Sequence, residues 1–133
     1  MKIIDLIKLI LTFIGTSLGY FLGGFDALLV TLLLFMIIDY ITGVLDAISN
    51  KKLSSSVGFK GICKKVIILL MVTIANRIDI TLGLQEIRYV VISFYLANEG
   101  ISIIENASLL GVPIPQKLED ILEQLKNEEK ESQ

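Results

Sequence analysis

Four apolar segments separated by short polar stretches dominate the hydropathy pattern of the chain. The first runs from about residue 3 to 22 and the second from about 27 to 48, and the stretch "GGFDA" forms the turn between them. Each segment reaches the ~20 apolar residues that a helix needs to cross a hydrocarbon core about 30 Å thick. The pattern therefore predicts two transmembrane helices in the first 48 residues.

The third and fourth apolar segments are weaker. The third covers about 62–80, but its uncharged centre is only 66–76, and the fourth covers about 87–104 and contains Asn98 and Glu99. Each could cross the bilayer, lie in its interface or re-enter it. We expect an all-α integral membrane protein with about four transmembrane helices, of which the third and fourth are marginal.

The chain becomes polar after Gly111, which is expected to end the fourth helix. "VPIP" at 112–115 should be extended or turning because the residue before a proline disfavours the helical conformation. Apolar residues then recur at spacings of 3 and 4, which predicts an amphipathic helix over about 116–128: Leu118, Ile121, Leu122 and Leu125. We expect residues 1–111 to form the membrane domain and 112–133 a cytoplasmic tail.

The distribution of lysine and arginine predicts an orientation. The segment between the second and third spans is rich in lysine and should therefore lie in the cytoplasm. Alternation of the spans then places both termini in the cytoplasm as well. The lysines assigned to this basic loop are Lys51, Lys52, Lys60, Lys64 and Lys65.

Small residues recur at a helical spacing. Gly15, Gly19 and Gly23 lie four residues apart in the first segment, and Gly43 lies in the second. Glycines at this spacing let two helix backbones approach closely, which is a common route to helix association in lipid. We expect these glycines to pack against another helix, although glycine is also simply frequent in membrane helices.

Two polar stripes interrupt the apolar segments. A carboxylate near the centre of a membrane helix costs roughly 2.5–3.5 kcal/mol on insertion scales, so these side chains should face protein or water. They could line a pore or a subunit interface, or they could be structural, with Glu99 bonded to Asn76 or Arg77. The stripe on the second span comprises Asp39, Thr42 and Asp46, and that on the fourth Asn98, Glu99, Ser102, Glu105 and Asn106.

Composition supports a membrane protein and gives no case for an enzyme. The chain is 53% hydrophobic with a mean hydropathy of +0.74, whereas soluble domains are roughly 45–50% apolar. A net charge of −2 does not suggest nucleic acid as a partner. The chain has no histidine and a single cysteine, Cys63. We expect no catalytic set, metal or cofactor.

The residues also resemble a known family. "DYITGVLDAISNKKLSSSVGFKGICKK" and "YLANEGISIIENASLLGVPIPQKLEDIL" are similar to the phage lysis and toxin-secretion holins of Gram-positive bacteria and their phages. The resemblance covers about residues 39–125, and the motif Asn98-Glu99-x-x-Ser102 followed by Glu105-Asn106 is its strongest part. It implies a protein that accumulates in the cytoplasmic membrane and assembles into lesions that depolarise the cell. Its partners would be the lipid bilayer and further copies of itself, and the lesions would release an endolysin or a toxin without necessary direct contact.

Two other functions remain open from the residues. One is a small ion channel or transporter subunit, in which Asp39 or Glu99 binds a proton or a cation. The other is a non-conducting membrane scaffold whose C-terminal helix recruits a partner.

Overall fold

The computed structural model describes residues 2–131, and within this range the chain is helical with no strand. Its five helices are α1 (Ile3–Leu22), α2 (Ala27–Ser49), α3 (Ser55–Leu82), α4 (Glu86–Leu109) and α5 (Gln116–Glu131). The prediction of an all-α protein is confirmed. α1, α2 and α4 are long and apolar enough, with few enough charged residues, to cross a membrane, and α3 is not among these helices. The chain is thus a membrane protein by the length and composition of these helices, and the span count of four stays a prediction.

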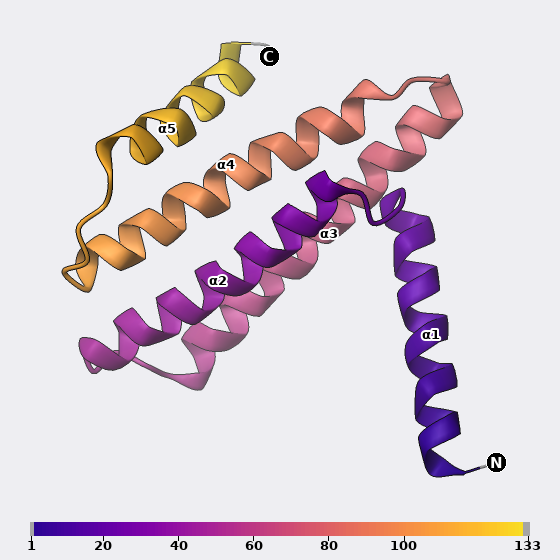
Figure 1. Cartoon of the computed structure of the whole chain (residues 1–133), viewed down its shortest axis with the longest axis horizontal. Helices are drawn as coiled ribbons and strands as arrows, with labels where there is room; N and C mark the ends of the chain where they lie inside the picture. The colour runs from indigo at the N-terminus through magenta and orange to yellow at the C-terminus, as the bar shows by residue number, and fades with distance from the viewer. Residues whose placement is uncertain (1, 132–133) are drawn as a thin grey trace.

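Helices α2, α3 and α4 lie side by side and form the body of the molecule (Figure 1). α5 turns back along α4, and α1 points away from the body as a separate limb. The core is a small apolar cluster inside the α2–α3–α4 bundle, closed at one end by Leu22 of α1. Its members are Leu22, Leu29, Leu32, Met36, Ile68, Val72 and Ile92.

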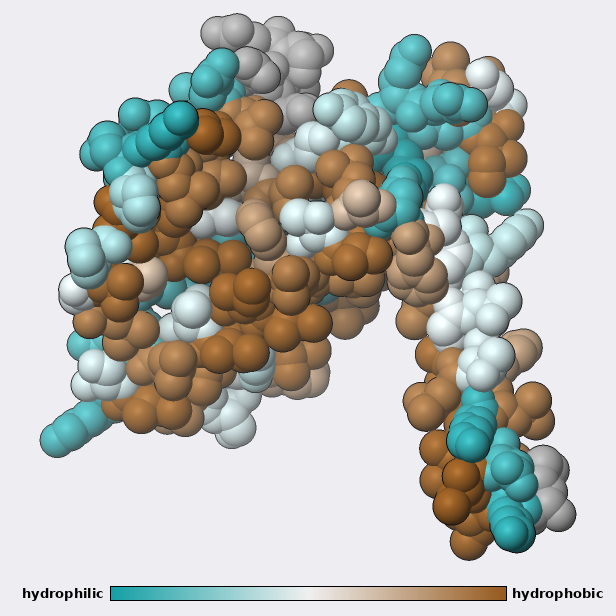
Figure 2. Space-filling model, in the orientation of Figure 1, coloured by the Kyte–Doolittle hydropathy of each residue, from teal (hydrophilic) through white to brown (hydrophobic). Residues whose placement is uncertain are grey.

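Most of the large apolar side chains lie outside this core. Ile37 on α2 is 57% exposed and Ile67 on α3 is 56% exposed, and α1 is exposed along most of its length. Figure 2 shows apolar residues covering much of the visible face of the body. A water-soluble monomer rarely exposes so large a continuous apolar surface. This exterior fits contact with lipid acyl chains.

Local signals in the sequence explain where the helices begin. The Asp26 carboxylate accepts a hydrogen bond from the Leu29 backbone N–H at 2.9 Å and caps α2, and the Ser54 hydroxyl accepts one from Val57 at 3.2 Å and caps α3. Ser54 therefore starts α3 well before residue 62, where the third apolar segment begins. The assignment of Lys60, Lys64 and Lys65 to a loop is wrong, because all three lie on α3, and only Lys51 and Lys52 lie in the connection.

The glycines predicted to pack helices together have different surroundings. Gly43 faces Asn106 on α4, and a Cβ there would lie 3.6 Å from the side-chain nitrogen of Asn106. Gly19 instead faces the Phe25 ring, and Gly15 has no neighbouring atoms within 4 Å of a Cβ position. Gly23 is not in the helix. It ends α1 with a left-handed φ of +88°, which glycine adopts without the steric cost of a Cβ.

Candidate functional site

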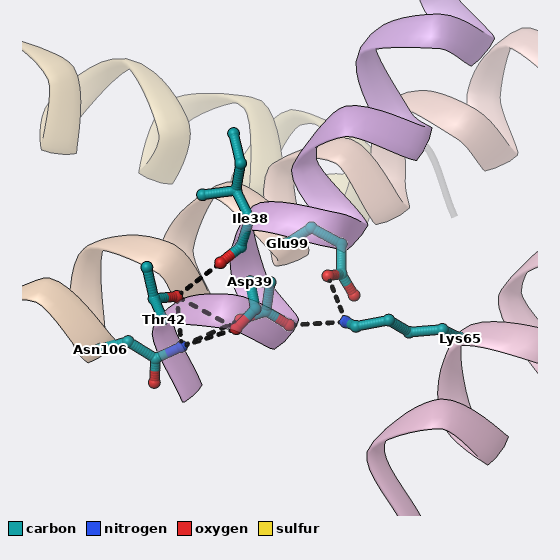
Figure 3. A network of polar contacts seen from close by, with 6 residues as sticks. All are labelled: Ile38, Asp39, Thr42, Lys65, Glu99 and Asn106. Atoms are coloured by element: carbon teal, nitrogen blue, oxygen red, sulfur yellow. Dashed lines mark hydrogen bonds and ion pairs between the residues drawn. The ribbon is translucent and has the colours of Figure 1, made fainter. Parts of the chain in front are cut away.

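The two polar stripes meet on either side of a lysine in the centre of the bundle (Figure 3). The Lys65 ammonium on α3 lies 2.7 Å from a carboxylate oxygen of Asp39 on α2 and 2.8 Å from one of Glu99 on α4. The three side chains are largely buried, with exposed fractions of 17% for Lys65, 15% for Asp39 and 9% for Glu99. We call Asp39, Lys65 and Glu99 the charge cluster.

Asn106 extends the charge cluster toward the end of α4. Its side-chain N–H donates to the second carboxylate oxygen of Asp39 at 3.1 Å and to the Thr42 hydroxyl oxygen at 3.0 Å. The Thr42 hydroxyl in turn lies 2.9 Å from the backbone carbonyl oxygen of Ile38, to which it donates. Both carboxylate oxygens of Asp39 are therefore occupied by donors from other helices, so this charge is satisfied within one subunit.

A cavity of about 410 Å³ lies beside the charge cluster. It is formed by α2, α3 and α4 toward the end of the bundle where the connection between α2 and α3 lies. Gly58 and Gly61 line it without side chains, and Ser102 lies on its wall with Asn106. The cavity gives the charge cluster a polar approach from one end of the bundle, while its other surroundings are packed helices.

The structure thus brings together five of the eight residues predicted from the stripes. Asp39, Thr42, Glu99 and Asn106 belong to the hydrogen-bonded network or its ion pairs, and Ser102 lines the adjoining cavity. The other three lie apart. Asp46 accepts a hydrogen bond from Asn50 at the exposed end of α2, Glu105 is exposed, and Asn98 is half-buried outside the network.

Lys65 is the residue of the charge cluster that the sequence pattern did not identify as a partner of the two carboxylates. The structural alternative for Glu99 named Asn76 or Arg77 as its partner, and the partner in the structure is instead Lys65. Lys65 was assigned to the cytoplasmic basic loop together with Lys64. The signal that could have found it is the series Gly58, Gly61, Lys65 and Ile68, which shares one helical face once Ser54 is taken as the cap.

A second polar cluster ties α1 to the bundle at the opposite end. The Arg88 guanidinium on α4 donates to the backbone carbonyls of Leu22 at 2.7 Å and Gly24 at 3.0 Å, and it forms an ion pair with Asp26 at 2.7 Å. Asn76 on α3 donates to the Phe21 carbonyl at 3.2 Å. We call these contacts the α1 latch. They satisfy carbonyls at the C-terminus of α1, which a helix leaves without internal partners.

Two further residues are needed for the α1 latch. Gly23 leaves space for its side chains, and Asp79 holds the start of α4, where Arg88 lies. A Cβ at Gly23 would lie 2.6 Å from both the Arg88 and Asn76 side chains, so only glycine fits there. The buried Asp79 carboxylate accepts hydrogen bonds from the backbone N–H groups of Ile87 at 3.1 Å and Arg88 at 2.8 Å. A carboxylate at a helix N-terminus is favoured by the helix dipole, so Asp79 fixes the start of α4 and with it the position of Arg88.

The Asp26–Arg88 pair predicts an acid-dependent loss of stability. The hydrogen bond from Arg88 holds the pKa of the Asp26 carboxyl below its ordinary value of 3.8. Its stabilisation is therefore present above that value and is lost as the pH falls through the lower pKa of the folded state. Asp26 is 51% exposed, so we expect only a small contribution, below about 1 kcal/mol.

The measurement is thermal unfolding in detergent between pH 6 and about pH 3, a range that brackets the ordinary carboxyl pKa. The comparison is the Asp26→Asn variant. Asparagine can still cap α2 but carries no charge. Asp26→Asn should lose less stability on acidification than the parent chain. Identical pH profiles would contradict a role for this ion pair.

The part of the chain that the structure describes, residues 2–131, contains no group of three His, Cys, Asp or Glu side chains placed to hold a metal ion. The charge cluster has two carboxylates on one ammonium, and both oxygens of Asp39 and one oxygen of Glu99 accept hydrogen bonds from protein donors. It can hold helices together and can exchange protons or contact water through the cavity.

Comparison with known proteins places this arrangement in a family. A 14.9 kDa protein of Clostridium perfringens described as uncharacterized is 43% identical over 95% of this chain and 97% of its own. An uncharacterized protein of Listeria monocytogenes is 45% identical over 81% of this chain and 78% of its own, and Bacillus subtilis YqxH is 40% identical over 85% and 81%. No solved structure matches. The model of the bacteriophage holin family matches residues 16–127, and the chain therefore belongs to that family.

Proposed function

We propose that the protein is a holin that accumulates in the cytoplasmic membrane of a bacterium and then oligomerises into lesions. The lesions would depolarise the cell and release an endolysin for lysis or a toxin for secretion. Membership of the bacteriophage holin family carries the proposal. The apolar exterior around a buried charge cluster supports it, because such a subunit is compatible with lipid while it is closed.

We propose four transmembrane helices, which are α1, α2 and α4 together with α3, whose apolar half carries more charged residues than the others. The connections 50–54 and 83–85 are short, and α3 joins the end of α2 to the start of α4. If α2 and α4 both cross, α3 must cross between them, and its 28 residues span about 42 Å at 1.5 Å per residue. Its polar residues Lys65, Asn76 and Asp79 are turned toward protein partners rather than lipid.

The orientation that we propose has both termini in the cytoplasm. Lys51 and Lys52 in the connection between α2 and α3, together with Lys60 and Lys64 on the first turns of α3, place that end of the bundle inside. The α1 latch then lies at the outer surface. The cavity beside the charge cluster would open toward the cytoplasm.

The test is expression in a bacterium with and without a cytoplasmic muralytic enzyme. A holin should cause an abrupt loss of membrane potential, followed by lysis only where the enzyme is present. Slow, ion-selective leakage without enzyme release would instead indicate a channel or transporter subunit. Expression without any depolarisation would indicate a scaffold, and either result would overturn the proposal.

Glu99→Leu should delay or abolish triggering while leaving membrane insertion intact. The substitution leaves Lys65 paired with Asp39 alone, so the formal charge of the cluster changes from −1 to zero. A neutral cluster is cheaper to keep in a low-dielectric interior, and the drive to exchange it for water should fall. The measurements are lysis time, oligomer size and amount of protein in the membrane.

Glu105→Leu is the matched control, since Glu105 lies on the same helix but is exposed and outside the network. It should keep the lysis time of the parent chain. If Glu99→Leu also keeps the parent lysis time and oligomer size, the charge cluster has no part in triggering.

A further inference from the structure

The position of α5 does not fit a helix surrounded by lipid. α5 turns back along α4 (Figure 1). A Cβ added at Gly100 on α4 would lie 3.0 and 3.1 Å from the two methyl carbons of Leu122 on α5. Leu122 is 8% exposed and packs against the bare backbone of α4 at that glycine. Gly100 is thus the position on α4 at which α5 docks.

This docking position lies far from the C-terminal end of α4. Nine residues separate Gly100 from Leu109, the last residue of α4, which corresponds to about 14 Å at 1.5 Å per residue. A hydrocarbon core is ~30 Å thick, so Gly100 would lie near the middle of the bilayer if α4 crosses it as proposed above. The docked part of α5 would then lie beside the membrane-embedded half of α4.

α5 carries too much charge for that position in lipid. Between residues 116 and 127 it has five charged side chains, of which Lys117, Asp120 and Glu123 are exposed. Charged groups are costly in hydrocarbon and are found facing protein or water. The described residues offer no second helix over the polar side of α5, since α5 packs only along α4. Docked α5 therefore requires water beside it.

The docking contact is also limited in extent. Of the four apolar residues predicted for this helix, Leu122 alone is buried, whereas Leu118 and Ile121 are each 46% exposed and Leu125 is 37% exposed. A helix held by so few buried groups can leave and return without unfolding the α2–α3–α4 bundle, whose core lies elsewhere.

We infer that α5 docks on α4 at Gly100 only where water replaces lipid beside α4, so that α5 lies in the water-facing wall of the assembled lesion. Before assembly, α5 lies undocked in the cytoplasm. This assigns the water-facing side of the assembly to α4 and α5. The inference rests on the proposed holin function and on α4 crossing the bilayer.

Disulfide formation between α4 and α5 tests the inference. Cys63→Ser removes the native thiol, and Gly100→Cys with Leu122→Cys then places one thiol on each helix. Loss of the Leu122 methyl groups makes room for the new side chain at position 100. In cells treated with a mild oxidant before and after depolarisation, the cross-linked fraction should rise severalfold on depolarisation.

The matched control pair is Tyr40→Cys with Gly61→Cys, which joins α2 to α3 inside the bundle, where a Cβ at Gly61 would lie 3.5 Å from the Tyr40 ring. Its cross-linked fraction should be the same in both states. A second measurement uses Leu122→Cys alone with α4 unchanged. Its alkylation by a small thiol reagent should slow after depolarisation, because docking buries this position.

Equal cross-linking of positions 100 and 122 before and after depolarisation, or a fall afterwards, would overturn the inference. So would an unchanged alkylation rate at position 122. Failure of the proposed function has a different signature, since the Cys63→Ser parent would then not depolarise the cells at all. If the cells depolarise but cross-linking and alkylation at position 122 do not change, the result is consistent with the holin proposal and contradicts only the role of α5.

Discussion

Lys65→Met is expected to destabilise the folded subunit by about 3–5 kcal/mol, the range for removing one partner of a buried ion pair. The substitution keeps an unbranched side chain, one atom shorter, and removes the ammonium that lies 2.7 Å from Asp39 and 2.8 Å from Glu99. Two buried carboxylates would then face each other without a cation. The measurements are thermal unfolding in detergent and the amount of protein that accumulates in the membrane.

Lys64→Met is the matched control, because Lys64 is the neighbouring residue on α3 and is exposed. It should change stability little. Combining Lys65→Met with Asp39→Asn and Glu99→Gln should restore much of the stability, since no buried charge then lacks a partner. If Lys65→Met is no worse than Lys64→Met, the charge cluster does not hold the three helices together.

Arg88→Ala should release α1 from the bundle and cost about 2–3 kcal/mol of stability. It leaves the Leu22 and Gly24 carbonyls without their donor and Asp26 without its partner, and a partly buried group that loses such a partner costs about 1–3 kcal/mol. The Arg88 side chain is only 13% exposed, so water replaces it poorly. The expected result is faster proteolysis between α1 and α2 and an altered lysis time.

Arg77→Ala is the control for charge, because Arg77 is exposed on α3 near the same end of the molecule. It should leave proteolysis between α1 and α2 unchanged. Asp26→Asn should have a smaller effect than Arg88→Ala, since asparagine keeps the cap of α2 and the two carbonyl contacts of Arg88 remain. Equal proteolysis of Arg88→Ala and the parent chain would show that α1 is held by its apolar contacts alone.

The helices could be predicted from local signals, because each signal acts within a few residues. Asp26 and Ser54 are cap residues, Gly23 ends α1, and the apolar runs have the length of membrane helices. The start of α3 was missed because the lysine-rich stretch before residue 62 was interpreted as a loop. Lys64 and Lys65 are adjacent, and the local sequence does not show that Lys64 is exposed while Lys65 lies inside the bundle.

The charge cluster and the side chains hydrogen-bonded to it could be predicted in part. Asp39, Thr42, Glu99 and Asn106 stood out because a polar residue in an apolar helix requires a partner. The identity of that partner could not be derived, since Lys65 is 26 residues from Asp39 and 34 from Glu99. The partners of Arg88 in the α1 latch could not be derived either, since it bonds to carbonyls more than 60 residues away.

The sequence by itself determined that this is an all-helical protein with an apolar exterior and polar groups that lipid cannot accommodate. These properties follow from composition and periodicity, which act locally. Only the tertiary structure decided that Lys65 pairs with both carboxylates, that Arg88 and Asn76 hold α1, and that α5 packs on Gly100. Such pairings depend on which helix faces come together, and many pairings satisfy one hydropathy pattern equally well.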